Sequence, residues 1–307
     1  MTAATKKTGA RGHASEEVRF AALLLAPCLL VALLFAFYPI LYSLYLSLGG
    51  TILSLPGSER IFMGAENFIE LFHDTVARAA LAHTLIFVIV STALEVMLGL
   101  GIALVINRSF RGRGVLRAAV LVPWAIPTVV ASQMWRFIFN DNYGLLNYVV
   151  FGADPSSFQA WLADPAMSFV AIIIADVWKT SSFAALIMLA GLQMIPDELY
   201  ESALIDGAGA WQRFKSITLP LVRSSLLIAL LFRTLDAFRV FDLVFVMTQG
   251  GPADATNVLQ FYGYRKIFAE GFLGYGSAIS VLVFFVSCAV CVFYIRALGM
   301  KMFGADE

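Results

Sequence analysis

One uncharged run near the start of the chain limits the folds open to it more than any other feature. Residues 20–48 form 29 consecutive positions without Asp, Glu, Lys or Arg. A helix needs about 20 apolar residues to cross about 30 Å of hydrocarbon, so this run is long enough to span a bilayer with some tilt. It is also longer than the apolar region of about 7–15 residues in a secretory signal peptide, and therefore predicts a retained membrane helix.

Similar apolar stretches recur along the rest of the 307 residues. Hydrophobic residues make up 60% and charged residues 14% of the chain, whereas soluble domains have about 45–50% and about 25%. The stretches are continuous and do not alternate, which favours helices over a β-barrel. We therefore predict an all-α polytopic membrane protein with six transmembrane helices. The predicted spans are residues 20–48, 81–106, 118–139, 167–192, 219–246 and 272–294.

The basic residues indicate an orientation. The predicted loops and ends on one side of the membrane carry 13 Lys and Arg residues, and those on the other side carry four. Because short cytoplasmic loops carry the excess of Lys and Arg, both termini are predicted to be cytoplasmic. Residues 1–18 are polar and rich in Gly and Ala, and predict a flexible cytoplasmic tail before a transmembrane domain at 19–307. The net charge of zero argues against a nucleic-acid binder.

The cytoplasmic segment 195–218 contains a short predicted helix. Asp197 is placed to cap its start and Gly207 to end it, which leaves roughly nine helical residues between them. So short a helix is marginal in water and needs a surface to dock against. The small residues Ala203, Gly207 and Ala208 suit insertion into a cleft. An ordinary connecting loop with one helical turn remains the alternative.

This segment resembles a known family. The pattern Glu201-Ser202-Ala203-x-x-Asp206-Gly207-Ala208, followed by Phe214 and Leu219-Pro220, is similar to the EAA motif of the membrane subunits of binding-protein-dependent ABC importers. Ser202 departs from the usual Ala. The resemblance implies a coupling helix at residues 197–210 that docks onto an ATPase subunit. The residues implied as ATPase contacts are Glu201, Ala203, Asp206, Gly207 and Ala208.

The resemblance extends over nearly the whole chain. The stretches Thr248-Gln249-Gly250-Gly251-Pro252 and Leu192-Gln193-x-Ile195-Pro196 are similar to sugar-importing members of the maltose and glycerol-3-phosphate type. Residues 178–180 and 232–239 resemble the trehalose-type disaccharide branch. The resemblance implies a type I ABC importer permease fold in the bacterial inner membrane. It also implies a second homologous permease subunit, a cytoplasmic ATPase dimer and an extracytoplasmic sugar-binding protein as partners.

Charged residues lie inside the predicted spans, where each costs about 2.5–3.5 kcal/mol at the membrane centre. Asp176 and Lys179 are three residues apart and can pair on one helix face. Arg233, Asp236, Arg239 and Asp242 are also three apart. Because a helix has about 3.6 residues per turn, nine residues turn a half circle, so Arg233 and Asp242 face opposite sides and all four cannot line one pore.

The roles of these charges remain open between structural ion pairs and a ligand site. Positions counted from the shared motifs imply a substrate pathway, with carboxylates and guanidinium holding a sugar. The residues implied are Asp176, Lys179, Thr180, Phe183, Asp236 and Arg239. Glu95 and Arg136 are expected to pair with partners on other helices, with extension to the lipid headgroups as the alternative for Arg136. Pro123 and Pro127 are expected to kink span three.

Two other functions are weighed against the permease. An ion-coupled secondary transporter would use Asp176 or Asp236 as an ion site, but this does not explain residues 201–207. A membrane-embedded enzyme would need a polar catalytic cluster, and the sequence indicates none. No phosphate-binding G-x-x-x-x-G-K-[ST] pattern is present. We therefore predict a translocation subunit with no cofactor or metal of its own, and with ATP and Mg²⁺ bound by the partner ATPase.

Overall fold

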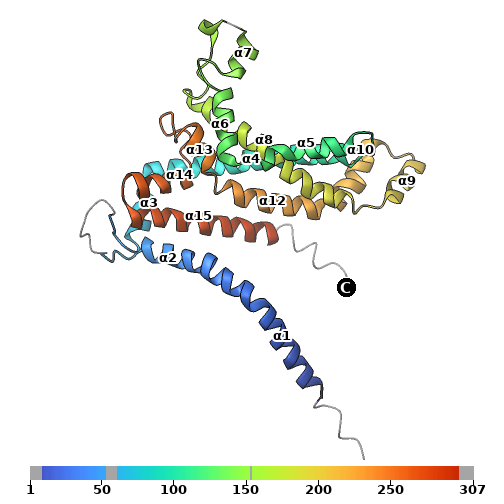
Figure 1. Ribbon diagram of the computed structural model, residues 1–307, viewed down its shortest axis with the longest axis horizontal. Helices are drawn as coiled ribbons and strands as arrows, with labels where there is room; N and C mark the ends of the chain where they lie inside the picture. Colours follow the sequence, from blue (N-terminus) through green and yellow to red (C-terminus); the bar gives the residue numbers. More distant parts are fainter. Residues whose placement is uncertain (1–8, 53–60, 153, 297–307) are drawn as a thin grey trace, which may run out of the picture.

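The structure, a computed structural model, describes residues 9–52, 61–152 and 154–296 (Figure 1). Every regular element in these ranges is helical. Two isolated β-bridges follow the first long helix: Gly49 pairs with Phe62 within the loop, and Ile52 pairs with Phe272, directly before the last helix. The all-helical prediction is confirmed for the described part of the chain.

Four continuous helices are long and apolar enough to cross a membrane. The first, Arg19–Ser47, combines most of α1 (Gly9–Ala32) with a π-turn and α2 (Tyr38–Ser47). The others are α4 (Thr75–Asn107), α8 (Pro165–Leu192) and α15 (Leu273–Tyr294). Because α1 begins at Gly9, the helix extends into the segment predicted as a flexible tail.

Two further helix pairs are each bent at a break. α5 (Arg113–Ala125) and α6 (Thr128–Ile138) meet at 92°, on either side of residues 126–127. The segment Ala210–Leu221 meets α12 (Arg223–Ala237) at 64°. The first bend follows from Pro127, which removes a backbone donor and disfavours helical geometry at the residue before it. The described chain thus has four candidate spans, or up to six if each bent pair is one span.

The fifth predicted span, 219–246, is shorter than expected. α12 ends at Ala237, and the separate helix α13 (Asp242–Met247) follows only after residues 238–241. Non-helical backbone at membrane depth is tolerated where it is buried in protein or lines a polar cavity. Residues 239–241 do line such a cavity, which is described below.

α4 and α8 pack closely at the centre of the bundle. The apolar window of α8 is 67% buried. At Gly99 of α4, an added Cβ atom would lie only 2.8 Å from the Cβ of Ala184 on α8, so only glycine permits this approach. Small residues at a helix interface allow close backbone approach in membranes, where packing drives association.

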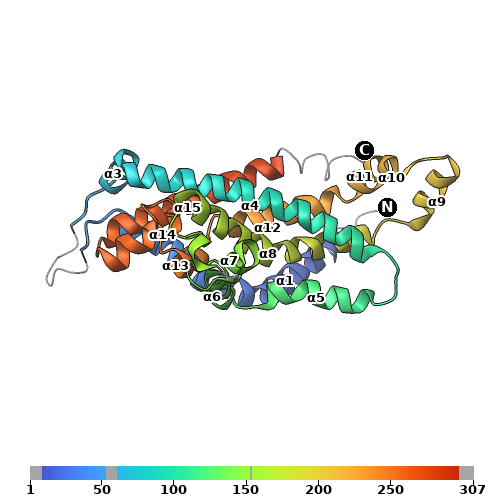
Figure 2. The same ribbon diagram turned by 90° about the horizontal axis from the view of Figure 1, so that it is seen from above.

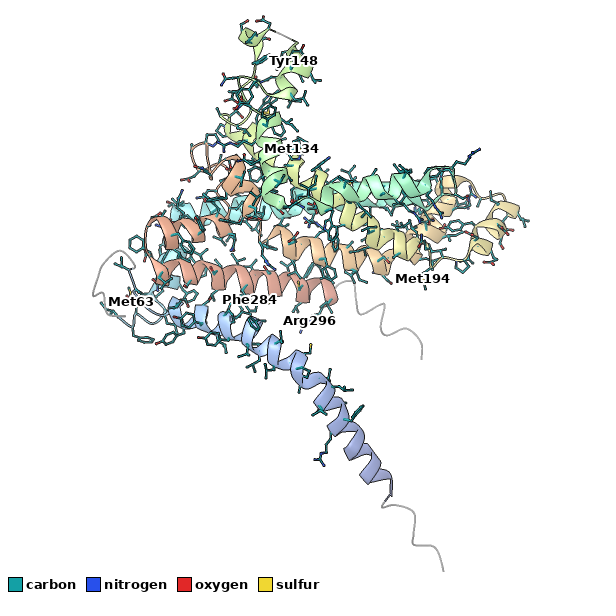
Figure 3. The ribbon with its side chains drawn as sticks, in the orientation of Figure 1. Met63, Met134, Tyr148, Met194, Phe284 and Arg296 are labelled. Carbon is teal, nitrogen blue, oxygen red and sulfur yellow. The ribbon has the colours of Figure 1, made fainter. Side chains whose placement is uncertain are left out.

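The remaining elements mark the two ends of the molecule and one side arm. α3 (Glu66–His73) lies at one end and α9 (Asp197–Ile205) at the other (Figure 2). α6 leads into an arm that carries α7 (Leu145–Phe151), with Tyr148 near its tip (Figure 3). The shorter elements are η2 (Pro155–Ser157), α10 (Ala210–Arg213), η3 (Phe214–Thr218), α11 (Leu219–Leu221), α14 (Leu259–Tyr264) and η4 (Arg265–Ala269).

Candidate functional site

A polar pocket of about 230 Å³ lies where the break after α5 meets the end of α12. Charged and aromatic side chains make up much of its wall. The lining residues are Trp124, Thr128, Asp176, Lys179, Thr180, Arg233, Asp236, Ala237, Arg239, Val240, Phe241, Asp242 and Leu243. Five of the six residues predicted for the substrate pathway are among them.

All four charges of the run 233–242 line this one pocket, so the prediction that they cannot is wrong. It assumed a continuous helix, whereas α12 ends at Ala237. The turn that follows brings Arg239 and Asp242 to the same cavity as Arg233 and Asp236.

Arg233 is the centre of a buried ionic cluster that joins three spans. Its Nε lies 2.5 Å from Oε2 of Glu95 on α4, and its Nη2 lies 3.2 Å from Oε1 of the same carboxylate. Its Nη1 lies 2.5 Å from Oδ2 of Asp236. Its Nη2 also lies 3.6 Å from Oδ2 of Asp176 on α8. The expectation that Glu95 pairs with a residue on another helix is confirmed.

Lys179 does not pair with Asp176 as expected. Its Nζ donates to the carbonyl oxygens of Trp124 (3.2 Å) and Ile126 (2.8 Å). These carbonyls lie at the C-terminal end of α5, where helical carbonyls lack intrahelical partners and carry the negative end of the helix dipole. The ammonium of Lys179 therefore caps the broken end of a neighbouring helix.

Aromatic rings form the apolar part of the site. Trp124 lines the pocket and stacks on Phe183, with ring centroids 5.7 Å apart and an interplanar angle of 19°. Phe183 also meets Phe232 edge-on at 6.1 Å. Phe183, predicted to line the pathway, is not among the residues that line the pocket, and instead packs against Trp124, which does line it. Trp124 was not predicted to line the pathway, although its position between Pro123 and Pro127 marks it as part of the break.

The two other predicted pathway residues differ in exposure. Thr180 is buried and its hydroxyl donates to the carbonyl of Asp176 at 2.6 Å. Arg239 is exposed, and no ion pair of its guanidinium occurs among the described residues. The side chain of Asp236 is 66% exposed even though it bonds Arg233. The pocket therefore has buried charges on its inner wall and accessible ones at its edge.

The second predicted site lies at the far end of the molecule. α9 spans the nine residues Asp197–Ile205, which confirms the short helix. Asp197 is its first helical residue and makes no capping hydrogen bond, so its prediction as the cap is wrong. The helix also stops short of residue 210, because Gly207 adopts φ +80° and the chain turns there.

α9 presents most of its surface to solvent. Glu201 and Asp206 are exposed, and Ala203 and Ala208 are half-buried. The side chain of Ile205, just before the turn, is 88% exposed. A protruding helix with both acidic and apolar exposed residues is suited to contact with another protein.

Bent membrane helices around a charged pocket, together with a protruding helix at one end, define a membrane transport protein. The chain belongs to the family described as the binding-protein-dependent transport system inner membrane component, whose profile matches residues 95–302. It is therefore a multi-pass permease of the inner membrane.

Characterised relatives cover nearly the whole chain. The trehalose/maltose transport system permease protein MalF of Thermococcus litoralis is 42% identical, over 91% of this chain and 94% of that protein. The trehalose transport system permease protein SugA of Mycobacterium tuberculosis is 39% identical, over 99% and 94%. The sulfoquinovosyl glycerol transport system permease protein SmoG of Agrobacterium fabrum is 37% identical, over 92% and 91%.

Solved structures show the same fold. A chain of a bacterial ABC transporter involved in import of the acidic polysaccharide alginate superposes with a TM-score of 0.77 at 21% identity, covering 95% of this chain and 99% of that one. A second structure of a bacterial alginate transporter, in complex with a periplasmic protein bound to an alginate pentasaccharide, gives the same score. At this identity the match establishes the fold alone.

Proposed function

We propose that the chain is the translocating subunit of an ABC importer for an uncharged di- or oligosaccharide. The observation that carries this proposal is the pocket at the two helix breaks, which combines hydroxyl-binding charged groups with the exposed edge of an aromatic stack. Carboxylates and guanidinium groups bind sugar hydroxyls, and an aromatic face packs against the apolar face of a sugar ring.

The charges favour an uncharged sugar over an acidic one. Arg233 is already compensated by Glu95 and Asp236, and Lys179 by two carbonyl dipoles. Arg239 is the cation at the edge of the pocket, and Asp236 and Asp242 share that edge. An acidic sugar would thus meet at least as much negative as positive charge. Two of the relatives above are named for trehalose, an uncharged disaccharide.

The predicted partners complete the transporter. In this proposal six spans cross the membrane, both termini are cytoplasmic, and the complex is a type I importer. An ATPase dimer that binds ATP and Mg²⁺ docks on α9, and a sugar-binding protein docks at the opposite end. A second homologous permease supplies the other half of the pathway. ATP binding then moves α9, and the spans rearrange so that the pocket opens alternately to each side.

The residues to which this proposal assigns a role form two groups. The ATPase-contact group is Glu201, Ala203, Asp206, Gly207 and Ala208. The substrate-pathway group is Asp176, Lys179, Thr180, Phe183, Asp236 and Arg239, with Trp124 added by the structure.

One observation favours an ion-coupled secondary transporter as a second candidate. Oδ2 of the buried Asp176 accepts no hydrogen bond and faces other carboxylates across Arg233. A buried acidic group of this kind is a typical proton or ion site in transporters. An ion-coupled transporter would, however, leave the protruding helix α9 without a role.

Transport by the purified complex in proteoliposomes separates the two candidates. The proposal expects sugar uptake only when the ATPase subunit, ATP and the sugar-binding protein are all present. Glu201→Lys or Gly207→Glu is expected to abolish uptake while the chain still inserts into membranes, with Tyr148→Phe on the side arm as a matched control. Uptake driven by an ion gradient without any ATPase subunit would overturn the proposal.

A further inference from the structure

Tyr200 is the large side chain through which α9 meets the rest of the molecule. Seven of the nine residues of α9 are exposed, and only Tyr200 and Ala203 are half-buried. Tyr200 packs against an apolar cluster formed by residues of α4, α8 and α12, together with Ile195 and Val222. Its hydroxyl lies 3.0 Å from Oγ1 of Thr218. The side chain of Tyr200 and this hydrogen bond therefore connect an otherwise exposed helix to the bundle.

Thr218 lies where the chain enters the fifth span. It is buried and is the last residue of the π-helical turn η3, directly before α11. The 64° bend follows, and after it α12 runs to Arg233 and the pocket. π-helical turns have a strained, wider geometry and occur often at functional sites. Thr218 thus stands between the protruding helix and the helix that carries the centre of the ionic cluster.

We propose that the hydrogen bond between Tyr200 and Thr218 is the positioning contact that transmits movement of α9 to α12. This inference rests on the proposed function, because it assumes that an ATPase subunit moves α9. The bond spans 18 residues of sequence and closes the segment between them into one unit. When α9 is displaced, the closed unit carries the start of the fifth span with it.

The physical argument concerns what the chain would do without this bond. α9 is joined to the bundle by Pro196 on one side and by the turn at Gly207 on the other. Glycine at positive φ is a point where the backbone bends at little cost. A displacement of α9 alone would be absorbed by rotation there. The side-chain bond bypasses this bend and links α9 directly to Thr218.

Substitutions that remove only the hydroxyl groups test this inference in the complete transporter. Tyr200→Phe keeps the ring and its packing, and Thr218→Val keeps the shape of the side chain. Each is expected to lower the stimulation of ATPase activity by loaded binding protein about threefold to tenfold, the value of one hydrogen bond. The basal ATPase rate and the KM for ATP should stay unchanged. The double variant should be no worse than either single one, because both remove the same bond.

Two controls separate coupling from stability. Thr218→Ser retains the hydroxyl and should restore stimulation, and Tyr148→Phe on the side arm should have no effect. A purely structural role would reduce the amount of assembled complex and leave the ratio of stimulated to basal rate unchanged. If wild-type stimulation is intact and Tyr200→Phe equals wild type, the inference is overturned while the proposed function stands. If the wild-type complex shows no stimulation, the proposed function itself fails.

Discussion

α8 and the first long helix have similar lengths, but opposite relations to the rest of the molecule. The apolar window of Arg19–Ser47 is 0% buried, and that of α8 is 67% buried. α2 runs beside α15, and α1 then diverges from the bundle (Figure 1). The exposed helix has no charge after Arg19, whereas the buried one carries Asp176 and Lys179. Charges are found in this membrane protein where neighbouring helices supply partners, and apolar residues suffice where lipid or another subunit covers the surface.

Breaking the ionic cluster is expected to have the largest effect on stability. Glu95→Ala leaves the Arg233 guanidinium without its bidentate partner in a buried position. Loss of one partner of a buried pair costs about 3–5 kcal/mol of unfolding free energy. Denaturation of the detergent-solubilised protein measures this loss. The triple variant Glu95→Leu, Asp176→Leu, Arg233→Leu removes the three buried charges together and should be clearly more stable than Glu95→Ala. A Glu95→Ala variant as stable as wild type would show that the cluster contributes little.

Removing the ammonium that caps α5 should have the next largest effect. Lys179→Met keeps the length of the side chain but leaves the carbonyls of Trp124 and Ile126 without a donor. The free energy of unfolding is expected to fall by about 1–3 kcal/mol. The fluorescence of Trp124, which stacks on Phe183, should also change because the broken end of α5 is released. Lys179→Arg retains a donor and serves as the control. Unchanged stability and fluorescence in Lys179→Met would contradict the capping role.

The cap at the start of α4 should contribute less, and its contribution should depend on pH. The side chain of Asp74 forms this cap by accepting hydrogen bonds from the backbone N–H groups of Val76 and Ala77. Partial burial raises the pKa of its carboxyl, but these bonds and those from the hydroxyls of Tyr262 and Tyr275 outweigh burial and hold the pKa below its ordinary value. The stabilisation is therefore complete well above pH 4 and is lost as the pH falls through the lowered pKa.

Asp74→Ala is expected to cost about 0.5–2 kcal/mol at neutral pH, as loss of a helix cap does. Thermal unfolding at neutral pH and again near pH 3 measures the difference from wild type. That difference should shrink at the lower pH, because protonation weakens the wild-type contact. Asp74→Asn keeps an oxygen acceptor and separates the cap from the charge. If wild type and Asp74→Ala differed in stability by the same amount at both pH values, the charge of Asp74 would not contribute to the cap.

A substitution on the first long helix should have the smallest effect. The side chain of Leu29 is 62% exposed, so Leu29→Ala leaves no cavity. The stability of the solubilised chain should change by no more than about 0.5 kcal/mol. Leu189→Ala in the buried apolar part of α8 is the matched comparison, with an expected loss of about 2–5 kcal/mol. Equal effects at the two positions would remove the contrast between the two helices.

The sequence by itself determined the class of the protein, the membrane spans and the short helix α9. Uncharged runs of about 20 residues can only be satisfied in lipid as helices, so composition and run length predict the spans. The nine-residue helix α9 followed from Gly207, because a glycine stop is a local signal. The pairing of Glu95 with another helix followed from the cost of an isolated charge in the membrane.

Only the tertiary structure decided which charges meet. Spacing along one helix predicted that Asp176 pairs with Lys179 and that Arg233 and Asp242 face apart. Because α12 ends at Ala237, Arg233 and Asp242 line the same pocket. Lys179 donates to the unpaired carbonyls at the end of α5 and not to Asp176. Helical periodicity describes side chains only while the helix continues, and it takes no account of backbone groups freed by a neighbouring break. Contacts with other helices therefore determined which charged residues form the site.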